Sequence, residues 1–196
     1  LMKVPPRIQP LVEDGLVDEV ISRLMSGKEA DVYVVRSAGE IRCAKVYKDV
    51  TTRSFKQAVQ YQEGRKVRNT RRGRAMERGS KFGKQQKEQT WHTAEVDALA
   101  LLANTEVRVP EAHGLFDGVL LMELITGADG RVAPPLADIS MASEEAIKDH
   151  VTVIDFIKKM LCIGMVHGDL SEFNVLVDAN GPVIIDLPQA VDASAN

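Results

Sequence analysis

The chain has 196 residues, of which 44% are apolar and 27% charged, and its formal net charge is −3, as expected for an ordinary globular protein with a real core. Two widely separated cysteines, Cys43 and Cys162, indicate neither a disulfide framework nor a zinc site. This use of cysteine favours a reducing cytoplasm. No apolar run approaches the roughly 18 residues that span a bilayer, and no signal segment is visible, so we expect no membrane partner.

Residues 1–19 are predicted to form an N-terminal helical extension, in which Pro10 suits the first turn of a short helix and Gly15 its exit. From Val20 the pattern changes to short β-branched runs at 20–25, 30–36 and 40–47, which predict a three-stranded antiparallel meander. Strand alternation places four residues of the third run on one face: Ile41, Cys43, Lys45 and Tyr47.

A basic stretch follows at residues 64–87, rich in Arg and Lys, punctuated by glycine and almost without aliphatic side chains. Such a segment buries little apolar surface, so we expect a flexible arm. Its charge is consistent with contact to ribosomal RNA or a ribosomal subunit, and equally with a solvated run of charges.

Residues 90–103 are strongly helical in pattern, and one face carries Glu95, Ala98, Leu99 and Leu102. Two further strands are expected at 114–118 and 119–125, with a lobe boundary near Ile125 and a flexible connector over 127–135.

Ser143 is a predicted N-cap, and the helix that it begins runs to Gly164. Runs 175–178 and 183–186, joined by residues 179–182, then predict a β-hairpin. Because the chain begins at Leu1 and stops soon after this hairpin, we expect a fragment truncated at its C-terminus.

Polar residues crowd the end of the chain. Asp169 and Asn174 bracket a loop after the long helix, and Asp186 ends the second strand of the hairpin. A loop and hairpin of this kind can bring together an acceptor for a substrate proton and two oxygen ligands for a divalent cation. Such ligands, with phosphate oxygens, suit Mg²⁺ or Mn²⁺.

The motif H-G-D-x-x-x-x-N followed by I-D is similar to the H-R-D-x-x-x-x-N and D-F-G motifs of protein kinases. Upstream, Lys45 and Glu95 stand in the chain order of the phosphate-pairing lysine and its glutamate partner. The departures are a single glycine in SGKEADVY and D-L-P-Q in place of D-F-G.

Together, SGKEADVY, AKVYK, W-x-x-x-E, HGDLSEFNVLV and IIDLPQAV resemble the RIO family of atypical protein kinases and ATPases, from Ile8 to Asp192. The lead segment and the long insertion are most similar to the branch without a winged-helix domain, whereas LPQ is closer to other branches. The resemblance implies an α+β, two-lobed, protein-kinase-like (RIO) fold. Its N-lobe, 20–125, would be antiparallel β with one regulatory helix and the insertion 64–87, and its C-lobe, 126–196, would be reduced and mainly helical.

The resemblance also implies site roles. Asp169 would accept or orient the proton of the attacking hydroxyl or water, Asn174 and Asp186 would hold the metal, and Lys45, held by Glu95, would position phosphates. Asp186 is also the position that becomes an aspartyl-phosphate in some family members. The remaining nucleotide-binding set is Ser26, Gly27, Lys28, Val32, Cys43, Met122, Glu123, Ile125, Leu176 and Ile185.

The implied activity is transfer of the γ-phosphoryl group of ATP, with Mg²⁺ or Mn²⁺, to a protein hydroxyl, to the protein itself or to water. Gly168 replaces the arginine of ordinary kinases, and no A-P-E segment follows, which favours an ATP-driven switch or a kinase of restricted substrates. The family's work in small ribosomal subunit maturation would give the basic arm an RNA-bearing partner.

Two other readings remain open. Aminoglycoside and choline kinases also use H-G-D-x-x-x-x-N, but they carry a large helical substrate lobe after the metal aspartate. A catalytically silent scaffold that binds nucleotide or RNA is the alternative of a different class. The polar catalytic positions are all present, which favours an enzyme.

Overall fold

The structure is a computed structural model, and it describes residues 2–48, 94–187 and 190–192. These residues form two compact units. The first contains residues 2–48, 94–96 and 111–124, and the second contains 97–110, 125–187 and 190–192. The basic arm 64–87, with its expected flexibility, and Trp91 of the W-x-x-x-E motif lie outside the described residues.

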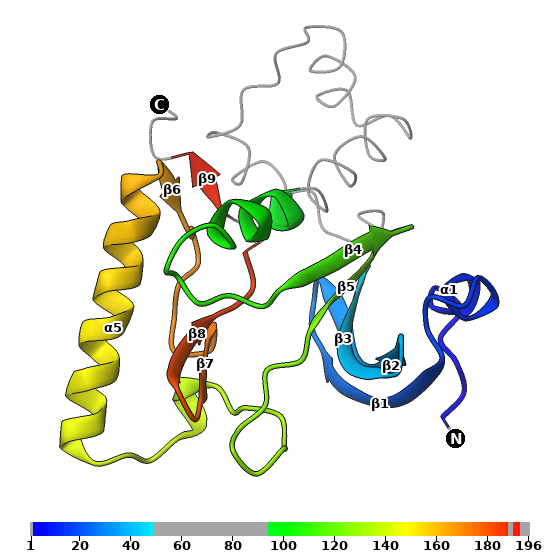
Figure 1. Cartoon of the computed structure of the whole chain (residues 1–196), viewed down its shortest axis with the longest axis horizontal. Coiled ribbons are helices and arrows are strands. Elements are labelled where there is room, and N and C mark those ends of the chain that lie inside the picture. Colours follow the sequence, from blue (N-terminus) through cyan, green and yellow to red (C-terminus); the bar gives the residue numbers. More distant parts are fainter. Residues whose placement is uncertain (1, 49–93, 188–189, 193–196) are drawn as a thin grey trace, which may run out of the picture. The chain divides into compact units, whose positions relative to one another are not determined.

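A five-stranded antiparallel sheet forms the first unit (Figure 1). Its strands are β1 (Glu19–Ser26), β2 (Ala30–Ser37), β3 (Glu40–Tyr47), β4 (Ala112–Phe116) and β5 (Val119–Glu123), in the order β1-β2-β3-β5-β4. The predicted meander and the two later strands are therefore confirmed. The β4–β5 turn has positive φ at Asp117 (46°) and Gly118 (79°), the backbone that a tight hairpin requires and that Asp-Gly readily adopts.

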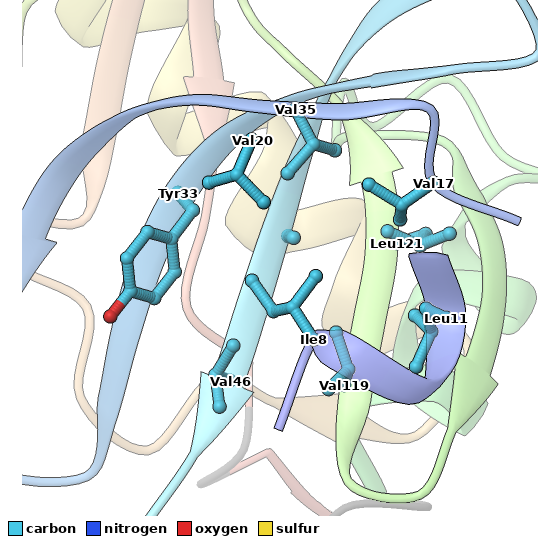
Figure 2. Packing of buried hydrophobic residues seen from close by; sticks show 10 residues of the cluster. Ile8, Leu11, Val17, Val20, Tyr33, Val35, Val46, Val119 and Leu121 are labelled. Carbon is cyan, nitrogen blue, oxygen red and sulfur yellow. The ribbon is translucent and has the colours of Figure 1, made fainter. Parts of the chain in front are cut away.

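One face of this sheet is covered by the N-terminal extension. The helix α1 (Gln9–Glu13) begins with Pro10 in its first turn, and Gly15 leaves it at φ 72°, as predicted. Ile8 and Leu11 of this segment pack against Val119 and Val46 of the sheet (Figure 2). The full buried cluster is Ile8, Leu11, Val17, Val20, Tyr33, Val35, Ala44, Val46, Val119 and Leu121. Each fully buried aliphatic side chain contributes about 1.5–3 kcal/mol, so this layer anchors β3 from behind.

A helix over residues 94–102 follows the undescribed segment. Its predicted face is confirmed, because Glu95, Ala98, Leu99 and Leu102 are all buried. The helix thus presents one carboxylate within an otherwise apolar stripe.

The second unit contains one long helix, α5 (Ser143–Cys162), with the short 3₁₀ helix η2 (Leu136–Asp138) before it. The predicted N-cap at Ser143 is wrong by one residue: Ala142 occupies the cap without a side-chain hydrogen bond, and Ser143 is already helical. Glu144 and Glu145 in the first turn offset the helix dipole instead. No helix in the described part of the chain is both long and apolar enough to cross a membrane.

Two small antiparallel sheets complete this unit. Strands β6 (Met165–Val166) and β9 (Val191–Asp192) pair, and β7 (Val175–Asp178) pairs with β8 (Gly181–Ile184). The predicted β7–β8 hairpin is confirmed, but its turn is only Ala179–Asn180, because the Asp178 carboxylate accepts the Asn180 N–H at 2.7 Å and closes it tightly.

The predicted flexible connector, residues 127–135, is instead a hydrogen-bonded loop. The Ala133 N–H donates to the Ile125 carbonyl at 2.9 Å, and the Val177 N–H of β7 donates to the Pro134 carbonyl at 3.0 Å. The loop therefore extends the edge of the β7–β8 hairpin. The glycine and proline residues of this loop form defined turns and do not indicate disorder.

Candidate active site

Lys45 and Glu95 form a buried ion pair within the first unit. The Lys45 ammonium donates to both carboxylate oxygens of Glu95, at 2.8 and 2.9 Å. Lys45 is on β3 and Glu95 on the helix 94–102, so the pair joins a strand and a helix that are 50 residues apart in sequence. This is the arrangement expected of a lysine that is oriented to meet phosphates.

Tyr47 adds a third member to the pair. Its hydroxyl donates to Oε2 of Glu95, and its ring lies 5.5 Å from the Lys45 ammonium, within cation–π range. The N-terminal segment fixes the same residue from the other direction, since Arg7 donates to the Tyr47 carbonyl at 2.9 Å. Tyr47 was not among the predicted site residues, although strand alternation already placed it on the face of Lys45.

Strand register defines the rest of that face. Directly opposite residues of antiparallel strands point to the same side, and Lys45 pairs with Val32 on β2 and Leu120 on β5. The neighbouring row is formed by Val34, Cys43 and Met122. Val32, Cys43, Lys45 and Met122, which are all in the predicted nucleotide-binding set, therefore lie on one face of the sheet, opposite to the face that α1 covers. Val34 and Leu120 share this face and were missed, although the period-two pattern marks them.

Cys43 is buried on this surface. Burial raises the pKa of its thiol to about 12; the Lys45 charge lowers it and the Glu95 charge raises it by smaller amounts. The thiol is therefore protonated at neutral pH and behaves as a small apolar side chain.

The glycine turn connects β1 and β2. Its tight form is closed by a hydrogen bond of 2.9 Å from the Gly27 N–H to the Ala30 carbonyl. Lys28 is exposed at the tip, whereas the Ser26 hydroxyl donates to Asp31 at 2.6 Å. The Ser26 side chain is thus held by a carboxylate of the chain itself.

The loop that carries Asp169 lies in the second unit. Gly168 has φ 83°, which turns the chain sharply after His167. The buried His167 accepts the Asp169 N–H at Nδ1 (3.3 Å), and its Nε2 lies 2.9 Å from the Ile185 carbonyl. These two partners are both satisfied only by a neutral imidazole protonated at Nε2. The Asp169 carboxylate is exposed, which is compatible with its predicted role as a proton acceptor.

Asn174 closes this loop. Its side-chain N–H donates to the Asp169 carbonyl at 2.8 Å, which leaves the amide oxygen as the group that it can offer to a cation. The Ile185 N–H donates to the Asn174 carbonyl at 3.0 Å, so the residue before Asp186 is tied to Asn174 across the hairpin. Asp186 itself lies two residues beyond β8 with φ 63°, a left-handed backbone that is uncommon for aspartate.

The donor set fits magnesium. Asn174 and Asp186 supply an amide oxygen and a carboxylate, and the described residues contain no cluster of three or more His, Cys, Asp or Glu side chains that could hold a metal alone. Mg²⁺ is commonly held by one or two protein oxygens together with phosphate oxygens and water. A site that is completed by phosphate is consistent with this set.

Two predicted adenine-site residues meet in a small apolar cluster of the second unit. Leu176 packs against Ile125, Ala133 and Val183. Of the other predicted residues, Ile185 makes backbone hydrogen bonds to the His167 side chain and to the Asn174 carbonyl. The Glu123 N–H donates to the Glu111 carbonyl at 2.8 Å, and the Glu111 N–H donates to the Glu123 carboxylate at 3.2 Å.

The RIO domain profile matches residues 31–196, which is most of the chain. The chain belongs to the RIO domain family. The matched residues include HGDLSEFNVLV and IIDLPQAV, so the resemblance to that family in these two motifs is confirmed.

Several RIO relatives match almost the whole chain. The human serine/threonine-protein kinase RIO1 is 33% identical over 91% of this chain, and the RIO-type serine/threonine-protein kinase Rio2 of Methanocaldococcus jannaschii is 32% identical over 94%. The chain spans only 30% of the human protein and 63% of the archaeal one.

A solved RIO structure shows the same fold. It is the Rio2 kinase–ADP/Mg²⁺–phosphoaspartate complex from Chaetomium thermophilum, with a TM-score of 0.65, 22% identity, and coverage of 96% of this chain and 53% of that one. The α+β, kinase-like fold expected from the sequence is therefore confirmed for this RIO domain.

Proposed function

We propose that this RIO domain binds ATP with Mg²⁺ or Mn²⁺ and transfers the γ-phosphoryl group to a protein hydroxyl, to itself or to water. The observation that carries the proposal is the buried, bidentate Lys45–Glu95 pair, on a sheet face that also holds Val32, Cys43 and Met122. The names of the relatives, serine/threonine-protein kinases, agree with it.

The geometry supports a role for each residue in this proposal. The exposed carboxylate of Asp169 accepts the proton of the attacking hydroxyl, while His167 and Asn174 fix the backbone on either side of it. Asn174 and Asp186 would hold the metal ion, which supplies charge neutralisation to the phosphates when bound. The Lys45 ammonium, kept in one orientation by Glu95 and Tyr47, meets the phosphates of the nucleotide.

The test is release of γ-phosphate from ATP, measured with and without added protein substrate. Asp186→Ala is expected to abolish metal-dependent turnover. Asp169→Asn should keep nucleotide binding and lose turnover by about 10²–10⁴-fold, as for a positioned acid–base group. Asp129→Asn, an exposed carboxylate in the loop 127–135, is the matched control and should retain the parental rate. Parental turnover in Asp186→Ala would refute the metal assignment.

The same assay separates the alternatives. A parent that binds ATP without any turnover would be a silent scaffold, and one that phosphorylates aminoglycosides or choline would be a small-molecule phosphotransferase. Because the solved relative is named as a phosphoaspartate complex, the protein itself is also examined for bound phosphate that hydroxylamine releases. Its presence in the parent, mapped by mass spectrometry to the peptide that contains Asp186, would assign Asp186 as the acceptor. Loss of the phosphate in Asp186→Asn would not do so by itself, because that variant also lacks a proposed metal ligand.

We further propose an RNA-bearing partner, such as a ribosomal subunit, for residues 65–87. This stretch contains ten Arg or Lys residues and one Glu, a density that favours phosphate-rich partners. Affinity for RNA should fall steeply with salt and be lost when the basic residues are replaced by glutamine. RNA binding that is insensitive to salt would contradict this assignment.

A further inference from the structure

A polar cluster lies beside the glycine turn between β1 and β2. The Lys48 ammonium donates to the Gly27 carbonyl at 2.7 Å and lies 3.1 Å from Oδ1 of Asp31 and 3.3 Å from the Ser26 hydroxyl. The same Asp31 oxygen accepts from Ser26 at 2.6 Å and from Arg23 at 2.8 Å. Four side chains therefore converge on a turn that contains a single glycine.

The cluster lies on the back of the turn. Register pairs Ser26 with Asp31, and Asp31 with Val46, a residue of the core cluster behind the sheet. Lys45 and Val32 belong to the alternate row, so their side chains point to the opposite face. Lys48 comes directly after β3 and two residues after Val46, so strand alternation places it on the same side as Val46. Its ammonium accordingly lies on the side of the strands that carries Ser26 and Asp31.

The charges of the cluster hold it together. Burial alone raises the pKa of Asp31, but the hydrogen bonds from Ser26 and Lys48 and the charges of Lys48 and Arg23 outweigh it, so the net pKa is lowered. The carboxylate thus stays ionised at neutral pH. Lys48 is further fixed at its backbone, where its N–H donates to the Glu29 carbonyl at 2.8 Å.

We propose that Lys48 is a positioning residue for the nucleotide phosphates: it holds the Gly27 carbonyl and, through Asp31, the Ser26 hydroxyl, and so fixes the glycine turn without contacting ATP itself. The inference rests on the proposed ATP binding. Asp31 lies in the motif SGKEADVY and Lys48 in AKVYK, but neither is among the predicted site residues.

The rival role for Lys48 is direct contact with phosphate, and the two roles predict opposite effects of Asp31→Asn. If Lys48 and Asp31 brace the turn, loss of the carboxylate releases Lys48 and Ser26 and weakens ATP binding. If Lys48 contacts phosphate, Asp31 competes with ATP for the same ammonium, and its loss strengthens ATP binding. The sign of the change therefore decides between them.

The experiment is calorimetric titration of the full chain with Mg-ATP and, separately, with adenosine. Lys48→Met and Asp31→Asn are each expected to raise the Kd for ATP about three- to tenfold, the range for a partly exposed polar network, with the Kd for adenosine unchanged. The Kd for ATP of the double variant should not exceed that of the single variant with the higher Kd, because both substitutions disrupt the same Lys48–Asp31 interaction. Lys48→Arg, which keeps the charge and donors, should recover most of the affinity.

A matched control is available in the second unit. The Lys159 side chain is 32% exposed and bridges Glu106 and Asp155, much as Lys48, 35% exposed, bridges its partners, so Lys159→Met should leave both Kd values unchanged. Unchanged ATP affinity in Lys48→Met, tighter binding in Asp31→Asn, or an equal loss for ATP and adenosine would each overturn the inference. If the parent itself fails to bind Mg-ATP, the proposed function falls, and this inference with it.

Discussion

The Lys45 ammonium donates to both oxygens of the Glu95 carboxylate, and neither side chain is more than 8% exposed. Removing one partner of such a pair leaves the other charge buried and uncompensated. Lys45→Met is therefore expected to lower the free energy of unfolding by about 3–5 kcal/mol, measured by urea denaturation.

The double variant Lys45→Met/Glu95→Gln provides the control for that cost. It removes both charges yet keeps an oxygen that can accept the Tyr47 hydroxyl, so it should be more stable than Lys45→Met alone. A double variant less stable than the single one would show that the loss in Lys45→Met comes from packing and not from an orphaned carboxylate.

Tyr47→Phe removes one hydroxyl from the same group. Hydrogen bonds to charged partners contribute about 1.5–3 kcal/mol, and we expect a loss of that size in the free energy of unfolding together with a raised KM for ATP. Tyr33→Phe is the matched control, since its ring lies in the core cluster on the opposite face of the sheet. An equal rise in KM in both variants would remove any specific role for the Tyr47 hydroxyl.

Local patterns predicted much of this molecule. The strand runs, the Pro10 and Gly15 ends of α1 and the buried face of the helix 94–102 follow from residue type and period alone. The motif residues Lys45 and Glu95 also meet as expected, because a helix stripe and a strand face each left one polar position among apolar neighbours.

Side-chain hydrogen bonds that depend on the tertiary fold could not be predicted from the sequence. Nothing local indicates that Tyr47 donates to Glu95, or that Ser26 donates to Asp31 rather than standing free for phosphate. The loop 127–135 reads as flexible because its glycines and prolines mark turns, whereas its order comes from bonds to β7. Residues 97–110, placed with the first lobe on chain order, cluster with the second unit.

His167 connects the loop that carries Asp169 with the segment that follows β8. If that loop has the proposed catalytic role, replacement of His167 should slow chemistry more than binding. His167→Leu removes the contacts to the Asp169 N–H and the Ile185 carbonyl, which frees the backbone that aims Asp169. Misplacement of a reacting group by about 1 Å can cost about 10²-fold, so kcat should fall by that order with little change in KM for ATP. His167→Gln, which keeps a donor and an acceptor, should recover part of the rate. A loss confined to KM would contradict the positioning role.

Arg108 clamps the turn of the β7–β8 hairpin. Its guanidinium donates to both oxygens of Asp178, at 2.9 and 2.5 Å, and to the Gly181 carbonyl at 3.1 Å. The hydrogen bonds from Arg108 are the largest cause of the lowered pKa of Asp178. Burial acts in the opposite direction, but the pKa remains below its ordinary value.

Because the folded pKa of Asp178 is depressed, its stabilising effect is present above the ordinary aspartate pKa near 3.8 and is lost as pH falls through the lower folded value. Asp178→Asn should cost about 1 kcal/mol of unfolding free energy at pH 7. The difference from the parent should shrink below about pH 4. Urea denaturation of both proteins at pH 7, 4 and 3 measures it, and a gap that is constant with pH would exclude the ion pair as its source.

The Cys43 thiol, on the proposed nucleotide-binding face, predicts a pH dependence of the unfolding free energy. Burial raises the pKa of its thiol from 9.0 to about 12 in the folded chain. A raised folded pKa stabilises the fold fully below the unfolded value, and this contribution is lost as pH rises from about 9 toward 12. Relative to Cys43→Ala, the parent should therefore lose about 2 kcal/mol of unfolding free energy between pH 9 and 10.5, since each pH unit costs about 1.4 kcal/mol.

Alkylation tests the placement of the same thiol. Cys43 pairs across the sheet with Met122 on the face of Lys45, so bound Mg-nucleotide should slow its reaction with iodoacetamide. Cys162 is exposed at the end of α5 and serves as the internal control, with a rate that does not depend on nucleotide. Mass spectrometry of the two cysteine peptides over time gives both rates from one sample. Because burial raises the pKa of this thiol, its labelling in the free protein is expected to be slow and is followed over hours at alkaline pH. A measurable rate that is equal with and without saturating nucleotide would mean that ATP does not cover this face, and the roles proposed for Val32 and Met122 would fall with it.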